Sequence, residues 1–343
     1  ACQGCIARPC MMNCPKKAIR VINGKAIIDE KLCVNCGICQ QSCPYHAITY
    51  IPIPCLSVCP VGAVEKDDDH IIRINEDKCI HCGQCIRICP FNAIMDRSQI
   101  LDVIRLILSE KKSIALIAPA VAGQFSGDYS KLIQAIRQLG FDYVVEVASG
   151  ADVTTEKESE ELFERLSQGH SFMTSSCCPA YVDTVERHLP ELNAFVSHTK
   201  SPMYYTAIQA LNQFPDGACV FIGPCTAKKQ EAFKYQEIKY VITFEELGAM
   251  LSARNIQLDA LEPSQPDISG TTAGRSFAVS GGVSRSILSA NQGREIKVVN
   301  INGLNKKSIQ SLKLYVNGTL KTDFIEVMTC EGGCIAGPNT VSN

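Results

Sequence analysis

The chain has 343 residues, enough for two or three domains, and a formal net charge of −2. This balance argues against nucleic acid or an anionic membrane surface as the main partner. No apolar run reaches the roughly 18 residues that a membrane helix needs. Apolar residues make up 46% of the chain, so large buried cores can form.

Twenty cysteines decide the class of protein. Fourteen of them fall in the first 89 residues, many in the Cys-x2-Cys-x2-Cys-x3-Cys-Pro run that is typical of bacterial ferredoxins. Disulfide scaffolds are usually small secreted domains with irregular spacing, so we interpret the cysteines as iron–sulfur ligands. Oxygen-sensitive clusters and reduced thiols indicate a reducing cytoplasm, in an anaerobe.

Residues 1–95 contain a duplication. The segment Pro9–Ile19 matches Pro54–Val64, and each copy is followed by a full cysteine run. Each repeat resembles a two-cluster ferredoxin, with hairpin strands expected at 24–29 and 70–75. We therefore predict one ferredoxin-like module at 1–50 and a second at 51–97.

The ferredoxin spacing predicts crossed ligation, in which the fourth cysteine of a run serves the other cluster. Three accessory 4Fe-4S clusters are expected, with the ligand sets Cys14, Cys33, Cys36 and Cys39; Cys2, Cys5, Cys10 and Cys43; and Cys59, Cys79, Cys82 and Cys85. Several clusters in one small region make an electron relay.

Cys55 and Cys89 are left over, because Ala47 and Tyr50 stand at the positions that match Cys2 and Cys5. They form either a degenerate site with two free thiols or a fourth cluster completed from elsewhere, for instance by a histidine. His46, His70 and His81 are interpreted as surface residues near turns.

From residue 98 onward, apolar runs alternate with amphipathic stretches. A helix at 98–110 links the front to the main domain, and 258–273 is expected to be a surface loop. The alternation predicts an α/β domain over 98–343, with parallel sheets and with four strand-end loops converging on one crevice. Strands are expected at 113–119, 143–147, 171–174, 219–222, 240–243, 276–280, 296–301 and 324–328, and helices at 129–139, 157–168, 202–213 and 244–254.

Five further cysteines follow predicted strands. Cys177 and Cys178 are adjacent, and neighbouring side chains on an extended segment point to opposite faces, so one can hold a cluster while the other stays free. Cys178, Cys225, Cys330 and Cys334 supply the four thiolates that a cubane needs, which leaves Cys177 over. A helix that begins at Cys330 would place Cys330 and Cys334 on one face.

Two other residues near these motifs have competing interpretations. Lys228 lies three residues after Cys225 and suits a small anionic ligand, whereas the alternative is a solvated helix start. Cys219, inside an apolar strand, is interpreted as a buried core thiol.

Three motifs together resemble the iron-iron (FeFe) hydrogenases, over essentially the whole chain. They are Thr-Ser-Ser-Cys-Cys-Pro-Ala-Tyr at 174–181, Gly-Pro-Cys-Thr-Ala-Lys-Lys at 223–229 and Val-Met-Thr-Cys-Glu-Gly-Gly-Cys-Ile at 327–335. The resemblance implies α+β ferredoxin-like cluster modules followed by an α/β catalytic domain of two parallel-sheet lobes. It also implies reversible hydrogen oxidation and proton reduction.

The resemblance further implies a six-iron H-cluster, in which a cysteine bridges a cubane to a di-iron unit with carbon monoxide, cyanide and azadithiolate. By motif position Cys178, Cys225, Cys330 and Cys334 hold the cubane, with Cys334 as the bridge. Cys177 would pass protons and Lys228 would bond a cyanide. The pocket or proton path would include Ala118, Pro119, Ser201 and Met328. The implied partners are H2, protons, a ferredoxin or similar carrier, and maturation proteins.

The sequence departs from the family pattern at Gly223, at Tyr181 and at Lys157, where the usual residues are Met, Trp and the proton-path Glu. Four nearby glutamates could relay protons instead, or could simply form a charged helix face: Glu156, Glu158, Glu160 and Glu161. These departures resemble a divergent subgroup. Two other functions stay open. The first is a hydrogenase-like protein of iron–sulfur cluster assembly that lacks the di-iron unit, although Cys177, Lys228 and the intact first motif argue against it. The second is a hydrogen sensor.

Overall fold

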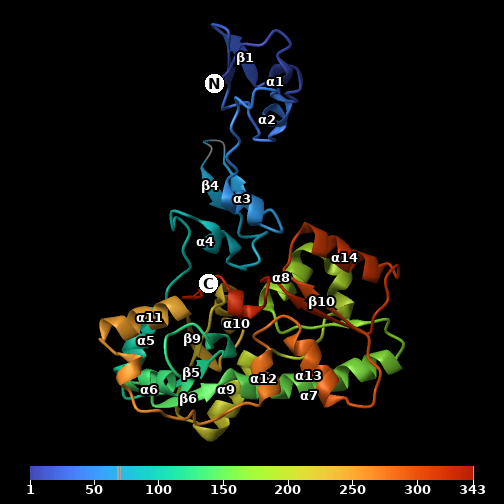
Figure 1. Cartoon of the computed structure of the whole chain (residues 1–343). Helices are drawn as coiled ribbons and strands as arrows, with labels where there is room; N and C mark the ends of the chain where they lie inside the picture. Colours follow the sequence, from blue (N-terminus) through green and yellow to red (C-terminus); the bar gives the residue numbers. More distant parts are fainter. Residues whose placement is uncertain (68, 70, 343) are drawn as a thin grey trace. The chain divides into compact units, whose positions relative to one another are not determined.

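The structure is a computed structural model that describes residues 1–67, 69 and 71–342 (Figure 1). Its chain contacts divide the protein into two compact units, residues 1–57 and 58–343. The three-domain division at 50/51 and 97/98 stays a prediction. Within the described ranges, no helix combines the length and apolar character that crossing a membrane requires.

The first unit combines a small hairpin with two cysteine-bearing helices. Strands β1 (Ile19–Ile22) and β2 (Lys25–Ile28) pair antiparallel, and helices α1 (Pro9–Met12) and α2 (Ile38–Ser42), which precede and follow the hairpin in the chain, contact each other. Asn23 and Gly24 both have positive φ, as a two-residue hairpin turn requires. The strand predicted at 24–29 is therefore confirmed. Helix α3 (Pro54–Val58) spans the boundary between the two units.

The second unit begins with the matching repeat. Strands β3 (Val64–Lys66) and β4 (Ile72–Ile74) pair antiparallel, and α4 (Gln84–Ile88) carries the end of the cysteine run. His70, in the strand predicted at 70–75, lies outside the described residues. Helix α5 (Ile100–Ile107) follows and packs against the next sheet, as expected for the link at 98–110.

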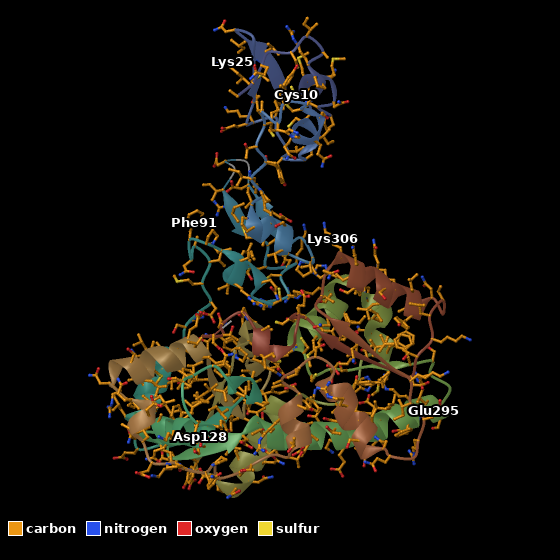
Figure 2. All side chains as sticks on the ribbon, viewed as in Figure 1. Cys10, Lys25, Phe91, Asp128, Glu295 and Lys306 are labelled. Atoms are coloured by element: carbon orange, nitrogen blue, oxygen red, sulfur yellow. The ribbon has the colours of Figure 1, made fainter. Side chains whose placement is uncertain are left out.

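A four-stranded sheet forms the first lobe of the α/β domain. Its order is β6-β5-β8-β9, all parallel, and the central strand β5 is buried at every position after its first residue. Helices α6 and α9 pack on this sheet, and α11 packs on α6. Asp128, labelled in Figure 2, caps α6 by accepting from Ser130 N. The bounds are β5 Lys112–Ile117, β6 Tyr143–Glu146, β8 Gly217–Ile222, β9 Ile238–Ile242, α6 Tyr129–Leu139, α9 Pro202–Gln213 and α11 Phe244–Ala253.

A three-stranded parallel sheet forms the second lobe, in the order β10-β11-β7. The predicted fold class, ferredoxin-like repeats followed along the chain by two parallel-sheet lobes, is therefore confirmed. The bounds are β7 Met173–Thr174, β10 Val298–Asn302, β11 Phe324–Met328, α7 Val147–Ser167, α8 Pro179–His188, α10 Thr226–Ala232, α13 Gly282–Ala290, α14 Lys306–Val316, and the short 3-10 turns η1 Pro119–Val121, η2 Pro190–Phe195, η3 Leu258–Ala260 and η4 Cys334–Ala336.

Two predicted elements are wrong in kind or extent, and one helix considered as a possibility is absent from the described residues. The segment 276–280 is no strand, because helix α12 (Thr272–Ser276) occupies its start and a tight turn follows it. The turn is so close that a Cβ on Gly282 would lie 1.8 Å from Ser276 O. Helix α7 begins ten residues before the predicted start. No helix begins at Cys330, where Gly332 and Gly333 adopt positive φ instead.

Helices α7 and α9 approach closely at Gly150, and this contact supports the wall of the central pocket. A Cβ at Gly150 would lie 2.2 Å from Pro202 O and 2.3 Å from Thr206 Oγ1. We expect Gly150→Ala to destabilise the fold by about 1–3 kcal/mol and to lower the midpoint of thermal unfolding, because neither backbone can yield without moving a helix.

The matched control is Gly248→Ala inside α11, where the added Cβ would lie no closer than 3.5 Å to a ring atom of Phe125. Removing a helical glycine there should raise the midpoint slightly, since alanine favours the helix by up to about 1 kcal/mol. Equal effects of the two variants on the midpoint would contradict the proposed close contact.

Candidate metal centre and active site

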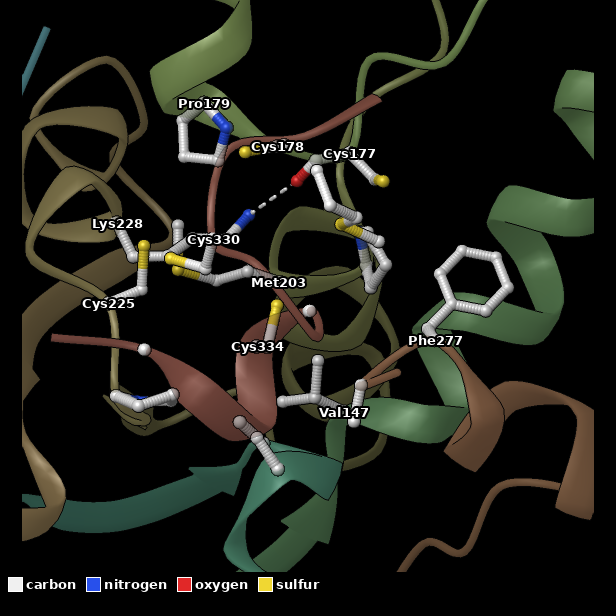
Figure 3. Close-up of a pocket in the computed structure, with 18 of the residues that line it drawn as sticks. Val147, Cys177, Cys178, Pro179, Met203, Cys225, Lys228, Phe277, Cys330 and Cys334 are labelled. Atoms are coloured by element: carbon white, nitrogen blue, oxygen red, sulfur yellow. Dashed lines mark hydrogen bonds between the residues drawn. The ribbon is translucent and has the colours of Figure 1, made fainter. Parts of the chain in front are cut away.

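Four strand-end loops line one pocket in the second unit (Figure 3). They follow β5, β7, β8 and β11, which come from both sheets. The lining of this pocket is almost entirely apolar. The predicted convergence of these loops is therefore confirmed, and it follows from the shared direction of parallel strands.

The four cysteines predicted as cubane ligands all line this pocket. Cys178 and Cys225 stand at the N-cap positions of α8 and α10, where helix N-termini favour negative charge. Cys330 and Cys334 come from the loop after β11. Figure 3 shows the sulfur atoms of Cys225 and Cys330 beside each other, with Cys334 below them. The structure thus brings the predicted set together, and its ligation of iron stays a prediction.

Burial strongly opposes thiolates in this pocket. Burial, together with the charges of the neighbouring cysteines, raises the pKa of Cys225 to about 11 and that of Cys334 to about 12. The pKa of Cys330 lies well above its usual value for the same reasons. A metal cluster would reverse this cost, because metal ligation deprotonates thiols and supplies the missing positive charge. The donor set and the apolar lining therefore fit an iron–sulfur assembly.

Cys177 is buried beside these thiols, but its side chain lies on the other side of the chain from Cys178 in Figure 3. Burial raises its pKa well above the usual value, and the charges of Glu158 and Cys178 raise it further. It is thus a neutral thiol at the wall of the pocket. This placement supports its interpretation as the thiol that is left free.

Lys228 also lines the pocket and is only 9% exposed, so the alternative of a solvated helix start is wrong. Its Nζ donates to Cys177 O at 3.4 Å and lies 2.6 Å from Glu231 Oε2. Burial by itself would lower the pKa of Lys228, but the Glu231 carboxylate and the nearby thiolates raise it overall. Lys228 is therefore a charged, fixed donor at the edge of the pocket.

Glu158 is the functional candidate that the sequence did not single out. It is fully buried in α7, and its Oε1 accepts from Ser176 N at 3.2 Å. Its Oε2 has no hydrogen-bond partner within the described part of the chain. Burial raises the pKa of Glu158 to about 8. A carboxyl group with such a pKa can take up and release a proton near neutral pH.

Lys157, aligned with the family's proton-path glutamate, lies exposed on α7 and does not face the pocket. Glu156 and Glu160 are exposed as well. In α7, Thr154, Glu158 and Arg165 lie on one buried helical face, which the neighbouring charged residues Glu156, Lys157 and Glu160 do not share.

Glu161 continues from Glu158 toward the surface. Its carboxylate accepts from His198 N at 2.8 Å and from Ser197 Oγ at 2.8 Å, and it pairs with Arg165 at 2.6 Å. Burial would raise the pKa of Glu161, but these hydrogen bonds and Arg165 lower it overall. Its partner His198 is largely exposed, with Nδ1 3.6 Å from Glu161 Oε1.

Of the other predicted pocket residues, Ala118, Pro119 and Met328 line the four-cysteine pocket. Ser201 lines a neighbouring pocket instead, together with Ser176. Its Oγ is buried and has no hydrogen-bond partner among the residues described. Ser201 is therefore not among the residues that line the four-cysteine pocket, and its predicted role stays untested.

Two departures from the family pattern have physical reasons here. A Cβ on Gly223 would lie 2.6 Å from the ring of Phe221, which already fills that space. Tyr181 is fully buried and donates from its hydroxyl to Thr174 Oγ1 at 2.9 Å. Cys219 is a buried core residue, as predicted.

Most of the accessory cysteines lie near other members of their predicted groups. In the first unit one pocket is lined by Cys14, Cys33, Cys36 and Cys39. Burial raises the pKa of Cys10, and the nearby charges of Cys43 and Cys5 raise it as well. Cys2 Sγ accepts from Ala26 N at 3.4 Å. In the second unit burial raises the pKa values of Cys79, Cys82 and Cys85, and the nearby charge of Cys59 contributes to each rise. Ligation at these sites stays a prediction, as does any cluster at Cys55 and Cys89.

The third accessory site adjoins the large pocket. Cys82 lines that pocket, and Gln84 Nε2 lies 3.9 Å from Cys330 Sγ, to which it donates. The contact requires Gly83, since a Cβ there would lie 2.6 Å from both Pro338 Cγ and Thr226 Oγ1. The sequence predicts His81 to be a surface residue, but it is half-buried beside Asp183.

Comparisons with known proteins identify the family. Residues 111–338 match the family described as "Iron only hydrogenase large subunit, C-terminal domain", and residues 26–49 and 72–95 match the 4Fe-4S binding domain. The protein belongs to the iron-only hydrogenase family. The match covers the loops that carry the four-cysteine pocket of this hydrogenase-like chain.

Curated relatives extend the likeness. Iron hydrogenase 1 of Clostridium pasteurianum is 31% identical over 66% of this chain and 50% of its own. The periplasmic Fe hydrogenase large subunit of Nitratidesulfovibrio vulgaris is 30% identical over 90% of this chain and 85% of its own. The NADP-reducing hydrogenase subunit HndD of Solidesulfovibrio fructosivorans is 25% identical over 90% and 56%. The hydrogenase-like chain thus spans about half the length of the first and third relatives.

Solved structures share the fold. A variant of the FeFe hydrogenase HydA1 from Chlamydomonas reinhardtii superposes with a TM-score of 0.58 at 22% identity, covering 71% of this chain and 85% of that one. A structure concerned with oxygen inactivation of an FeFe hydrogenase gives 0.59 at 23% identity, over 71% and 85%. These values establish the common architecture of the iron-only hydrogenase family.

The raised pKa of Glu158 predicts a pH-dependent stability. The folded state holds this proton up to a pH of about 8, whereas the unfolded chain releases it near the ordinary glutamate pKa of 4.5. The free energy of unfolding should therefore fall as the pH rises between these values, by up to about 4 kcal/mol between pH 5 and 8 for this one group.

We expect Glu158→Gln to remove the part of the pH-dependent fall in the free energy of unfolding that Glu158 causes. Denaturant titrations across the pH range would measure this free energy. The control is Glu156→Gln on the exposed face of α7, which should leave the profile unchanged. A Glu158→Gln profile parallel to that of the parent protein would contradict the assignment of a buried, protonated carboxyl.

Proposed function

We propose that this protein catalyses the reversible conversion of protons and electrons to H2 at a six-iron H-cluster, with electrons relayed through accessory 4Fe-4S clusters. The observation that carries the proposal is one apolar pocket in which four cysteines from three loops meet a fifth, buried thiol and a buried lysine. When bound, the H-cluster supplies the redox change and an open coordination position for hydrogen.

The residues that would hold this group divide the work between them. Cys178, Cys225, Cys330 and Cys334 would hold the cubane, with Cys334 as the bridging thiolate. Lys228 would donate to a cyanide, held in place by Glu231 at 2.6 Å. The apolar side chains of Ala118, Pro119 and Met328 exclude water from the pocket, which strengthens each of these electrostatic contacts.

Proton transfer would pass through side chains of α7 and its neighbours. Cys177 holds a proton at Sγ beside the pocket, and Glu158 is close enough for its charge to raise the pKa of Cys177. Glu161 follows on the same helix face and pairs with the exposed His198. This arrangement gives the buried thiol a series of ionisable groups that ends at solvent.

Electrons would reach the pocket from the accessory sites. The cluster held by Cys59, Cys79, Cys82 and Cys85 adjoins the pocket through Cys82 and through Gln84, which donates to Cys330 Sγ. The donor or acceptor outside the protein would be a ferredoxin or a similar carrier in a reducing cytoplasm. Maturation proteins would have to supply the di-iron unit.

Infrared spectroscopy tests the proposal directly. After maturation with a di-iron unit, the protein should show bands from bound carbon monoxide and cyanide. Lys228→Met should shift a cyanide band, because the charged donor is removed while the four cysteines remain. Iron–sulfur absorption without any such bands would favour the cluster-assembly alternative instead.

Cys177→Ala should leave the iron content intact and reduce H2 turnover by about 100-fold or more, the range expected when a positioned proton-transfer group is lost. Iron analysis and hydrogen production with a reduced dye would measure both quantities. Cys178→Ala should instead lose iron, and Cys219→Ala, in the core, should keep both iron and turnover. Full turnover in Cys177→Ala would remove its proton role.

A further inference from the structure

Charge is distributed unevenly between the two units. Residues 1–57 contain six Lys or Arg and two Asp or Glu, a net charge of +4. The remaining residues contain 27 and 33, a net charge of −6. The near-neutral total of the chain therefore conceals a basic first unit attached to an acidic second one.

The six cations of the first unit are all exposed, namely Arg8, Lys16, Lys17, Arg20, Lys25 and Lys31. Arg20 faces Asp29 at 3.8 Å. Within the described part of this unit, that is the only ion pair. Most of its positive charge is therefore directed to solvent and is available to a partner.

These cations lie beside the cysteine loops. Lys16 lines the same pocket as Cys14, and Arg8 precedes α1, which contains Cys10. Lys25 adjoins Ala26, whose N–H donates to Cys2 Sγ at 3.4 Å. Figure 2 labels Lys25 and Cys10 on this unit. A partner attracted by the cations is thus brought to the sulfur atoms.

Apolar side chains are exposed in the same loops. Ile6, directly after Cys5, is 100% exposed, and Met12, between Cys10 and Cys14, is 73% exposed. Short apolar contacts surrounded by charge are typical of weak, fast electron-transfer encounters, which bury less area than stable interfaces. The loops thus combine a steering charge with a small contact surface.

We infer that the cysteine loops of the first unit, with Lys16, Lys25, Ile6 and Met12, are the docking surface of an acidic one-electron carrier protein. The inference rests on the proposed electron relay and names its outer partner. In each encounter one electron passes from the reduced carrier to an oxidised cluster of this unit, or in the opposite direction when H2 is consumed. Opposite charges accelerate such encounters by about 10–1,000-fold at low salt.

The test uses the full chain with its 4Fe-4S clusters but without the di-iron unit, so that hydrogen turnover plays no part. Stopped-flow absorbance would follow reduction of the clusters by a reduced, acidic 4Fe-4S ferredoxin and, separately, by the methyl viologen radical. The variant is Lys16→Glu with Lys25→Glu. The matched control is Lys306→Glu with Lys307→Glu, which changes the total charge equally at exposed positions of α14.

The docking variant should react with ferredoxin at least about tenfold more slowly than the parent protein at low salt, and high salt should abolish the difference. Its rate with methyl viologen should stay within about twofold, as should both rates of the control. If the double variant loses iron, Lys16→Glu alone carries the test. An unchanged ferredoxin rate, or an equal loss in the control, would overturn the docking surface.

The methyl viologen rate separates this inference from the function on which it rests. Clusters that methyl viologen cannot reduce in the parent protein would overturn the relay itself, and the docking surface with it. Reducible clusters together with an unaltered ferredoxin rate in the variant would overturn the docking surface alone.

Discussion

Four thiol groups in an apolar pocket carry an electrostatic cost that shapes the rest of this protein. Burial raises the pKa of each of Cys225, Cys330 and Cys334, and each thiolate would raise those of its neighbours. A bound metal cluster removes this cost, since it replaces four protons with one compact positive core. The pocket is therefore suited to a cluster and poorly suited to four free thiolates.

The fold meets this constraint with two parallel sheets whose strand ends face one pocket. Three loops deliver the four sulfur atoms, and a fourth, after β5, delivers the apolar wall. Lys228, in the wall of this pocket, keeps its charge because Glu231 lies 2.6 Å away. Glu158, buried in α7, keeps its proton because burial raises its pKa, and its Oε2 has no hydrogen-bond partner among the described residues.

The sequence predicted the cysteine groups and most elements well, because both depend on local spacing. Helices α6 and α9 have the bounds that their apolar periodicity predicts. Glu158 could not be distinguished from Glu156 and Glu160 by sequence, since burial depends on which face of α7 meets the pocket. The strand predicted at 276–280 failed because apolar content alone does not reveal a turn as tight as the one at Gly282. That Ser201 lines a neighbouring pocket and not the four-cysteine pocket likewise depends on tertiary packing.

Iron anomalous scattering from crystals of anaerobically prepared protein would test the central claim most directly. The account predicts iron enclosed by the Sγ atoms of Cys178, Cys225, Cys330 and Cys334, with Cys177 Sγ outside the coordination of every iron of the cubane. Iron bound through Cys177 in place of Cys178, or an iron-free pocket in a protein whose accessory sites are filled, would contradict it.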